Sequence, residues 1–161
     1  ALIVMGLNSA LRIGDILSLR WEDVRRESAY RRHIWVREQK TGKDNMFPVN
    51  PMMVEALEFY RHYLTGYSSE KYIFESQKDR GNPISRSQAF RIIKKAADQC
   101  GLREHISCHS LRKTFGYYAW KQGTPPALLM SIYNHSSYEI TKRYLCIDQQ
   151  EKDKVYMEIQ L

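Results

Sequence analysis

Apolar residues recur along this chain with two periods, one typical of helices and one typical of strands. The opening ALIVMGLNSA is almost wholly apolar and predicts a buried helix over residues 1–9. It lacks the basic start of a signal peptide. The next stretch, RIGDILSLRWEDV, predicts a second helix from its apolar positions Ile13, Ile16, Leu17 and Leu19. Arg12 then stands at the junction of two apolar helices.

The pattern changes to strict alternation after residue 32. In HIWVREQ, Ile34 and Val36 alternate with Trp35 and Arg37, as in a strand with one buried face. The following KTGK places a glycine in a turn, and NMFPV returns as a second strand. These residues predict a β-hairpin.

The rest of the chain has helical periodicity with clear start and stop signals. Asn50 and Pro51 suit the N-cap and first position of a helix, and Gly101 and Gly123 suit helix ends. Ser136 and Glu139 have the spacing of a capping box. Three inward faces are expected: Met53, Leu57, Tyr60 and Leu64; Phe90, Ile93, Ala97 and Cys100; Leu111, Phe115 and Tyr118. The prediction is an α+β, mainly α domain with one small antiparallel sheet.

Charge and cysteine content narrow the class of function. The 161 residues include 25 Lys and Arg against 18 Asp and Glu, a net charge of +7. This excess favours a polyanionic partner, because basic side chains release counterions from phosphates. The three cysteines have unrelated spacings, which argues against a disulfide framework and predicts a reducing, cytoplasmic location. No apolar run reaches the roughly 18 residues of a membrane span, so no membrane partner is expected.

One pair of residues has the spacing of an anion site. In CHSLRKTFGYYAWKQG, His109 and Arg112 lie three residues apart at a predicted helix start, and therefore on one face. Free backbone N–H groups and the helix dipole favour anions there, and a guanidinium matches two phosphate oxygens. The alternative is a capping histidine beside a solvated arginine.

Two further groups carry cations at turns. Asp15 follows Arg12 by three residues and is expected to hold its guanidinium, with an ordinary helix salt bridge as the alternative. Lys40 and Lys43 flank the hairpin turn, either to reach into a groove or only for solubility.

A zinc site is the rival interpretation of the histidine region. Cys100, His105, Cys108 and His109 have the order C-x4-H-x2-C-H. Adjacent Cys108 and His109 are poorly placed to point at one tetrahedral ion, and Cys100 is expected on an apolar helix face. No metal site is predicted.

Four stretches occur in the order in which one family carries its catalytic motifs. ALRIGDILSLRWEDV resembles a first-arginine box, KTGKDNMFPV a hairpin-lysine box, HSLRKTFGYYAWKQG an H-x-x-R box, and NHSSYEITKRYL a histidine and tyrosine box. From Ala1 to about Ile147 the chain resembles the catalytic domain of the tyrosine recombinases, which include phage integrases and Xer-type site-specific recombinases. Ala10-Leu11 and Asn134 stand where the family usually has glycine.

The resemblance implies an active site and a reaction. Its catalytic residues are Arg12, Lys40, His109, Arg112, His135 and Tyr144, with Asp15 in support. Tyr144 would attack a DNA phosphate, giving a 3′-phosphotyrosyl link and a free 5′-hydroxyl. His109 would accept the phenol proton, Lys40 would protonate the leaving oxygen, and the two arginines and His135 would stabilise the phosphate charge. The phosphotyrosine conserves the bond energy, so no ATP, metal or other cofactor is expected.

The resemblance also implies partners. Double-stranded DNA is the expected substrate, with no small-molecule substrate, and the expected contacts are Lys43, Arg86, Arg91, Lys94, Lys113, Lys142 and Arg143. We expect residues 1–161 to be a catalytic domain that lacks the family's N-terminal core-binding domain. The family assembles as a tetramer on DNA, and the lone domain is expected as a monomer or weak oligomer. The tail, residues 148–161, is a candidate for docking on a neighbour.

Two alternatives remain open. A type IB topoisomerase-like enzyme would relax DNA by similar chemistry without strand exchange. A catalytically silent DNA-binding regulator would need none of the six groups, and the presence of all six argues against it.

Overall fold

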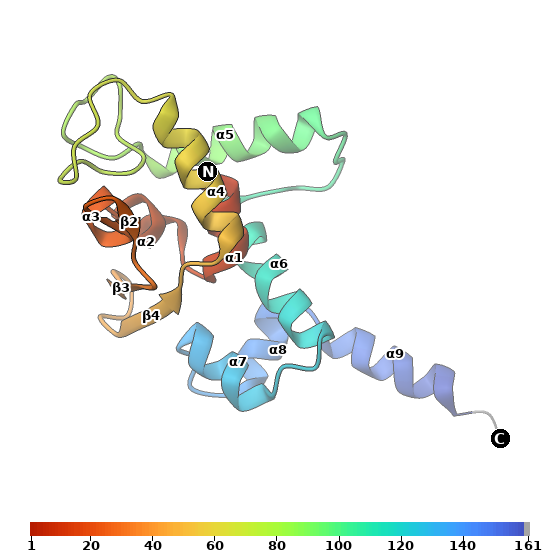
Figure 1. The fold of residues 1–161 in the computed structure, drawn as a ribbon. Helices are drawn as coiled ribbons and strands as arrows, with labels where there is room; N and C mark the ends of the chain where they lie inside the picture. Colours follow the sequence, from red (N-terminus) through yellow and green to blue (C-terminus); the bar gives the residue numbers. More distant parts are fainter. Residues whose placement is uncertain (160–161) are drawn as a thin grey trace. The chain divides into compact units, whose positions relative to one another are not determined.

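The computed structural model describes residues 1–159, apart from the side chains of residues 148, 150 and 151. The chain forms two compact units, Ala1–Arg112 and Lys113–Leu161, which are described in turn. The first contains α1 (Leu2–Ser9), α2 (Ile13–Leu17), α3 (Trp21–Val24), β1 (Arg25–Arg26), β2 (Ala29–Tyr30), β3 (His33–Arg37), β4 (Asp44–Pro48), α4 (Pro51–His62) and α5 (Arg86–Gln99) (Figure 1). Helix α6 (Cys108–Lys121) begins there, and α7 (Pro126–Tyr133), α8 (Tyr138–Leu145) and α9 (Asp148–Glu158) follow. The predicted α+β, mainly α class is confirmed.

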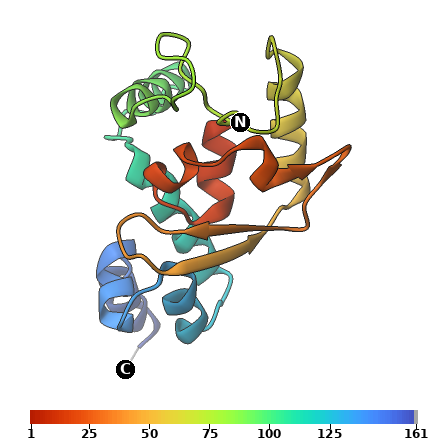
Figure 2. The same ribbon diagram turned by 90° about the vertical axis from the view of Figure 1, so that its left-hand side faces the viewer.

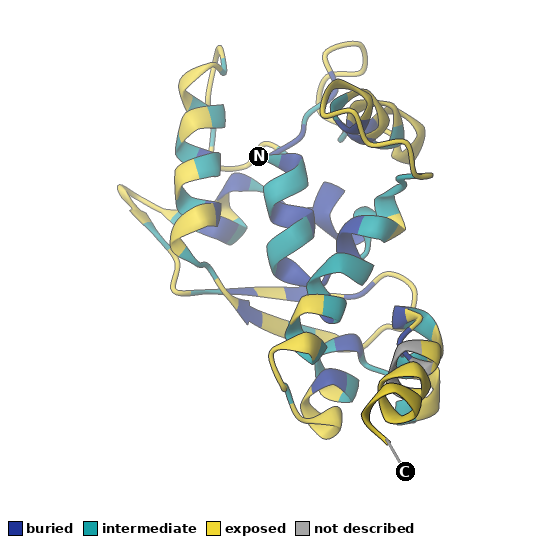
Figure 3. Cartoon of the chain, turned by 90° about the vertical axis from the view of Figure 1, so that its right-hand side faces the viewer, coloured by how far each residue is buried: buried dark blue, intermediate teal, exposed yellow. Residues whose placement is uncertain are grey.

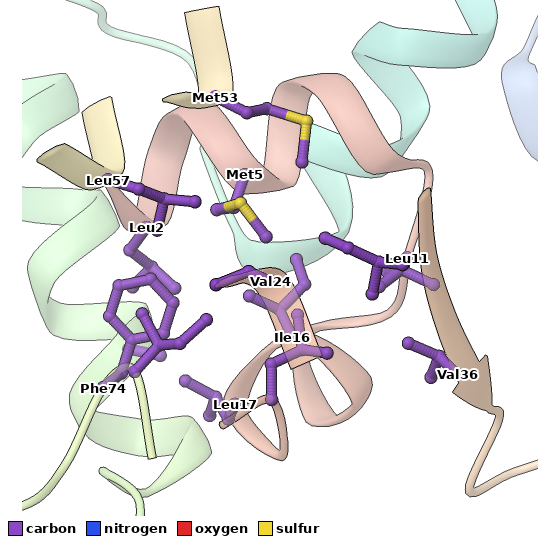
Figure 4. Close-up of a cluster of buried hydrophobic side chains, with 14 of the residues drawn as sticks. Leu2, Met5, Leu11, Ile16, Leu17, Val24, Val36, Met53, Leu57 and Phe74 are labelled. Carbon is purple, nitrogen blue, oxygen red and sulfur yellow. The ribbon is translucent and has the colours of Figure 1, made fainter. Parts of the chain in front are cut away.

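The core of the first unit forms around α1. Met5 of α1, Ile16 of α2 and Leu57 of α4 belong to one buried cluster, joined by Val36 from the hairpin and Phe74 from the loop after α4 (Figure 4). No residue of α1, beside the N-terminus, is exposed (Figure 3). Each side chain of the cluster stabilises the fold by about 1.5–3 kcal/mol when fully buried. The predicted buried helix at residues 1–9 is confirmed.

The predicted second helix is wrong in its extent. Residues 13–24 form two short helices, α2 and α3, because Leu17, Leu19 and Trp21 are all buried. A spacing of two residues reaches one face only in extended backbone, and Arg20 is extended at φ −100° and ψ 163°. The Leu19 carbonyl also accepts the N–H of Ile73, at 2.9 Å.

The predicted hairpin is confirmed. Strands β3 and β4 pair antiparallel, with Ile34 opposite Phe47 and Trp35 opposite Met46 (Figure 2). Ile34 and Val36 are buried while Trp35 is exposed, as the alternation predicts. The expectation of a single sheet is wrong, because β1 and β2 form a second two-stranded sheet.

The predicted start of α4 agrees with the structure, and α5 begins at a cap of the same kind. Asn50 caps α4 by accepting the N–H of Met53 at 2.9 Å, and Ser85 caps α5 by accepting the N–H of Gln88 at 3.1 Å. Cys100, expected on the apolar face of α5, is instead exposed where the helix ends.

Two expectations for the later helices are wrong. Tyr118 is 56% exposed, because the buried face of α6 passes through Gly116 rather than Tyr118. The cap of α8 is Ser137, which accepts the N–H of Ile140 at 3.3 Å, so the cap lies one residue after the predicted Ser136.

Gly116 sets the packing of the second unit. A methyl group there would meet the hydroxyl of buried Tyr133 and lie 2.6 Å from Leu145 Cδ2. We therefore expect Gly116→Ala to lower the free energy of unfolding by about 1–3 kcal/mol, measured by denaturant titration. The loss should shrink in a Tyr133→Phe background, which removes the nearest atom. An unchanged unfolding midpoint would contradict this packing.

Helix α9 ends the described chain. Val155, Tyr156 and Met157 are exposed on it, and Gln160 and Leu161 of the predicted docking tail lie outside the described residues. Within residues 1–159, no helix combines the length and the apolar character needed to cross a bilayer.

Candidate active site

A cleft of about 560 Å³ lies in the first unit. Its lining comes from the α1–α2 turn, the hairpin turn and the starts of α5 and α6: Arg12, Ile13, Gly14, Asp15, Gln39, Lys40, Arg86 and His109. The lining includes two arginines, a lysine and a histidine but only one carboxylate, that of Asp15. This excess of basic side chains suits an anionic ligand. A larger cleft, of about 690 Å³ beside Trp21, Tyr60 and Tyr67, is lined by other residues.

The turn between α1 and α2 presents Arg12. Ala10 is buried there in the left-handed conformation, at φ 54°, which costs a residue with a Cβ about 1–2 kcal/mol. Arg112 donates a hydrogen bond from Nη1 to the Ala10 carbonyl oxygen. The two predicted arginines are therefore held at the same turn.

The partner predicted for Arg12 is corrected by the structure. Its Nη1 lies 2.6 Å from Oε2 of Glu38, a carboxylate with no solvent exposure. Asp15, expected to hold Arg12, instead accepts the backbone N–H of Gln39 through Oδ1 at 2.9 Å. The carboxylate that pairs with Arg12 therefore comes from the β-hairpin, just before its turn, and not from α2. Asp15 supports the hairpin.

Lys40 follows two anchored residues. Glu38 pairs with Arg12, and Gln39 donates from its backbone to Asp15 and from Nε2 to the Gly14 carbonyl at 3.2 Å. The Lys40 side chain is exposed and lines the cleft. The Lys40 ammonium is therefore attached to an anchored stretch of backbone, which suits a proton donor.

The first turn of α6 brings His109 to the cleft and buries Arg112. The helix start is closed by Ser107 and Ser110, since the Ser107 N–H donates to Ser110 Oγ at 3.0 Å. His109 is exposed at the cleft, and Arg112 is only 2% exposed. Both alternative interpretations are thereby overturned: the cap is formed by serines, and the arginine is not solvated.

The second unit holds the other two predicted residues. His135 and Tyr144 have ring centroids 5.5 Å apart in an edge-to-face arrangement, and the Tyr133 ring lies 5.5 Å from that of Tyr144. His135 Nδ1 is 3.1 Å from Thr141 Oγ1, and the hydroxyl oxygen of Tyr144 is buried. Asn134 ends α7 in the left-handed conformation, at φ 55°, which asparagine tolerates well.

The predicted DNA contacts are spread over both units. In the first, Lys43 is exposed on the hairpin, Arg86 lines the cleft, and Arg91 and Lys94 are exposed on α5. In the second, Lys113 Nζ lies 5.6 Å from the Tyr144 ring centroid and 3.6 Å from Cys146 Sγ. Lys142 Nζ lies 3.5 Å from Glu139 Oε1, and Arg143 is exposed.

The cysteine and histidine groups do not assemble a metal centre in the described part of the chain. No three His, Cys, Asp or Glu side chains there are grouped as metal ligands. Burial raises the pKa of the Cys108 thiol, which disfavours the thiolate that zinc requires.

Both the sequence and the fold have known relatives. The model of the phage integrase family matches residues 1–151. The chain belongs to the phage integrase family. Two of its relatives are the Probable integrase/recombinase YoeC of Bacillus subtilis, 42% identical over 157 residues, and a tyrosine recombinase of Pseudothermotoga lettingae, 32% identical over 144 residues.

The matches differ in how much of each phage integrase family member they cover. The match with YoeC covers 96% of this chain and 81% of YoeC. The match with the Pseudothermotoga lettingae recombinase covers 88% of this chain and only 47% of that protein. The crystal structure of XerA recombinase superposes with a TM-score of 0.74 at 21% identity, over 98% of this chain and 57% of that one. The XerH recombinase bound to a palindromic difH substrate gives 0.72 at 18% identity, over 98% of this chain and 44% of that one. These likenesses show the fold.

Glu38 and Gln39 were not predicted as site residues, although the sequence carries a signal for Glu38. The buried face of β3 passes through Ile34 and Val36, and the same alternation places Glu38 inward. A carboxylate on a buried face needs a cationic partner. Nothing in the sequence pattern marks the Gln39 contacts, because they depend on how α2 meets the hairpin.

Proposed function

We propose that this protein is a site-specific DNA recombinase or integrase that cleaves and rejoins strands through a 3′-phosphotyrosyl intermediate. The observation that carries the proposal is the cationic cleft, where Arg12, Lys40 and His109 lie together beside the turn that holds Arg112. Membership of the phage integrase family supports it. The names of the relatives, integrase and recombinase, favour strand exchange over simple relaxation.

The proposed reaction is a pair of transesterifications. The Tyr144 oxygen attacks the scissile phosphorus, the bond from phosphorus to the 5′-oxygen breaks, and the DNA 3′-phosphate remains on the tyrosine. His109 accepts the phenol proton, and Lys40 donates a proton to the departing 5′-oxygen. Attack by a 5′-hydroxyl of another strand reverses each step. The phosphodiester is exchanged for a phosphotyrosyl ester, so no energy source is consumed.

The cations stabilise the charge that builds on the non-bridging oxygens. Arg12 and Arg112 remain protonated at any working pH, and a guanidinium offers several donors to one phosphate. One nitrogen of Arg112 is committed to the Ala10 carbonyl, which fixes the direction of the fork before the phosphate arrives. His135, edge-on to Tyr144, would add a further hydrogen-bond donor. Lys40 is favoured over Lys43 as the acid because it lines the cleft.

Covalent capture tests the function on many target sequences at once. The protein is incubated with a library of nicked duplexes randomised around the nick, in which the released fragment diffuses away and traps the intermediate. We expect a protein–DNA adduct that survives denaturing gel electrophoresis and enriches a defined sequence. Noncovalent binding with no adduct on any duplex would contradict the enzyme proposal and favour a silent regulator.

A second assay with the enriched site separates the two enzymatic possibilities. Two copies on one plasmid should give recombined products whose strands are exchanged between sites. Relaxation of a supercoiled plasmid without exchanged products would instead identify a type IB topoisomerase-like enzyme.

Other partners follow from the same proposal. The exposed cations Lys43, Arg91, Lys94 and Arg143 would contact DNA phosphates, so affinity should fall steeply with salt. A tetramer on two DNA sites is the proposed assembly, with the exposed apolar residues of α9 docking on a neighbour. The proposed location is the cytoplasm, on bacterial or phage DNA.

A further inference from the structure

The most deeply buried charged side chain of the hairpin belongs to Glu38. It has no solvent exposure, although it carries a carboxylate. Removing such a group from water is costly unless strong partners compensate, and apolar residues of similar size often serve stability equally well. A buried acid beside a cleft of catalytic cations therefore calls for an explanation other than stability.

Glu38 makes contacts in two directions. Toward α2, its Oε2 lies 2.6 Å from Nη1 of Arg12. Toward the turn, the same oxygen accepts from Thr41 Oγ1 at 2.7 Å, and Oε1 accepts from Asn45 Nδ2 at 3.4 Å. One carboxylate thus joins the first arginine to the residue that directly follows Lys40.

The backbone of Glu38 closes the same turn. Its N–H donates to the Lys43 carbonyl at 2.9 Å, and its carbonyl accepts from the Gly42 N–H at 2.8 Å. Lys40 lies inside this closed loop. Arg12 and Lys40 both line the cleft, so movement of Glu38 would displace both together.

We infer that Glu38 is a positioning residue that holds Arg12 and the Lys40 turn in the arrangement needed for phosphoryl transfer. This inference rests on the proposed function, because it assigns Glu38 to the same reaction. Glu38 acts through Arg12 and Lys40 and does not itself touch the DNA. Its negative charge also holds the guanidinium in one direction before a phosphate enters, so that Arg12 is shared between carboxylate and phosphate afterwards.

The test compares Glu38→Gln with the wild-type protein on the nicked duplex that the wild-type protein selects. The amide keeps the size of the side chain but loses its charge. We expect the single-turnover cleavage rate at saturating DNA to fall by about 10- to 100-fold, since small displacements of reacting groups have effects of this size. DNA affinity should stay within about threefold of wild type, because the phosphate-binding cations remain. The matched control is Glu58→Gln, which removes a carboxylate paired with Arg61 at 2.8 Å on α4 and should cleave at the wild-type rate.

A substrate with sulfur in place of the bridging 5′-oxygen separates positioning from a purely structural role. A thiolate leaves without a proton, so it bypasses Lys40. We expect the deficit of Glu38→Gln to be smaller on this substrate than on the oxygen ester, whereas partial unfolding would lower both rates equally. Thr41→Val removes two hydrogen bonds at the Lys40 turn, the one donated to Glu38 at 2.7 Å and the one accepted from the Lys43 N–H at 3.3 Å, and leaves the pair of Glu38 with Arg12. It should show the same selective rescue.

The outcomes separate this inference from the function on which it rests. Equal cleavage by Glu38→Gln and wild type would overturn the role of Glu38, and equal deficits on both substrates would overturn its hold on the Lys40 turn. Either result would leave the recombinase proposal intact. Failure of the wild-type protein to form any adduct would instead overturn the proposed function itself.

Discussion

Replacing Tyr144 with phenylalanine is expected to abolish covalent capture of DNA. Phenylalanine lacks the oxygen that bonds to phosphorus, so no adduct should appear above background on a denaturing gel. The ring contacts with His135 and Tyr133 need no hydroxyl, and noncovalent DNA affinity should therefore stay near the wild-type value. The two measurements together distinguish loss of chemistry from loss of fold.

The matched control is Tyr138→Phe at the start of the same helix. Tyr138 lies 5.7 Å from Lys142 Nζ, measured to its ring centroid, which is a packing contact that phenylalanine retains. This variant should form the adduct at the wild-type rate. The opposite result, with capture lost in Tyr138→Phe and kept in Tyr144→Phe, would show that the nucleophile is misassigned.

Arg112→Lys should lower the cleavage rate by about 10²–10³-fold, comparable to the loss of one preorganised donor at a developing anion. Arg112 is buried and donates from one nitrogen to the Ala10 carbonyl, and a guanidinium can keep such a contact while it also donates to a phosphate. Lysine is shorter and carries one ammonium in place of the rigid guanidinium fork, so we expect it to lose one of the two contacts. Loss of the buried hydrogen bond should also lower the free energy of unfolding by about 1.5–3 kcal/mol. The rate is measured in single turnover, and stability by denaturant titration.

Arg25→Lys is the control for this effect. Arg25 is another arginine that donates to backbone carbonyls, those of Glu27 at 2.8 Å and Ser28 at 2.9 Å, but it does not line the cleft. It should lose some stability and keep its cleavage rate. If Arg112→Lys behaved in the same way, with a lower unfolding midpoint and an unchanged rate in the folded protein, Arg112 would be structural only.

Much of the local structure that presents the site could be predicted from the sequence. The alternation at Ile34 and Val36 predicted the hairpin that carries Lys40, and the Asn50 cap predicted the start of α4. These features depend on the period of the side chains and on local backbone hydrogen bonds, both of which are determined by a few neighbouring residues. The four motif boxes then predicted which turns carry the catalytic residues.

The contacts between elements could not be predicted in the same way. Spacing favoured Asp15 as the partner of Arg12, because the two residues are three apart and would share a helix face. The actual partner, Glu38, directly follows β3 and lies 26 residues later in the chain. The break at Arg20 has the same cause, because the loop bond from Ile73 to Leu19 competes with helix continuation. Ala10 and Asn134 have a left-handed backbone, a conformation that glycine adopts most readily and that the residue types at these positions do not announce.

Mass spectrometry of the peptide that remains on DNA, after protease and nuclease digestion of the trapped adduct, identifies the nucleophile most directly. We expect a nucleotide joined through its 3′-phosphate to Tyr144, with a free 5′-hydroxyl on the released strand. A phosphate on any other side chain, or a linkage through the 5′-phosphate, would contradict this assignment.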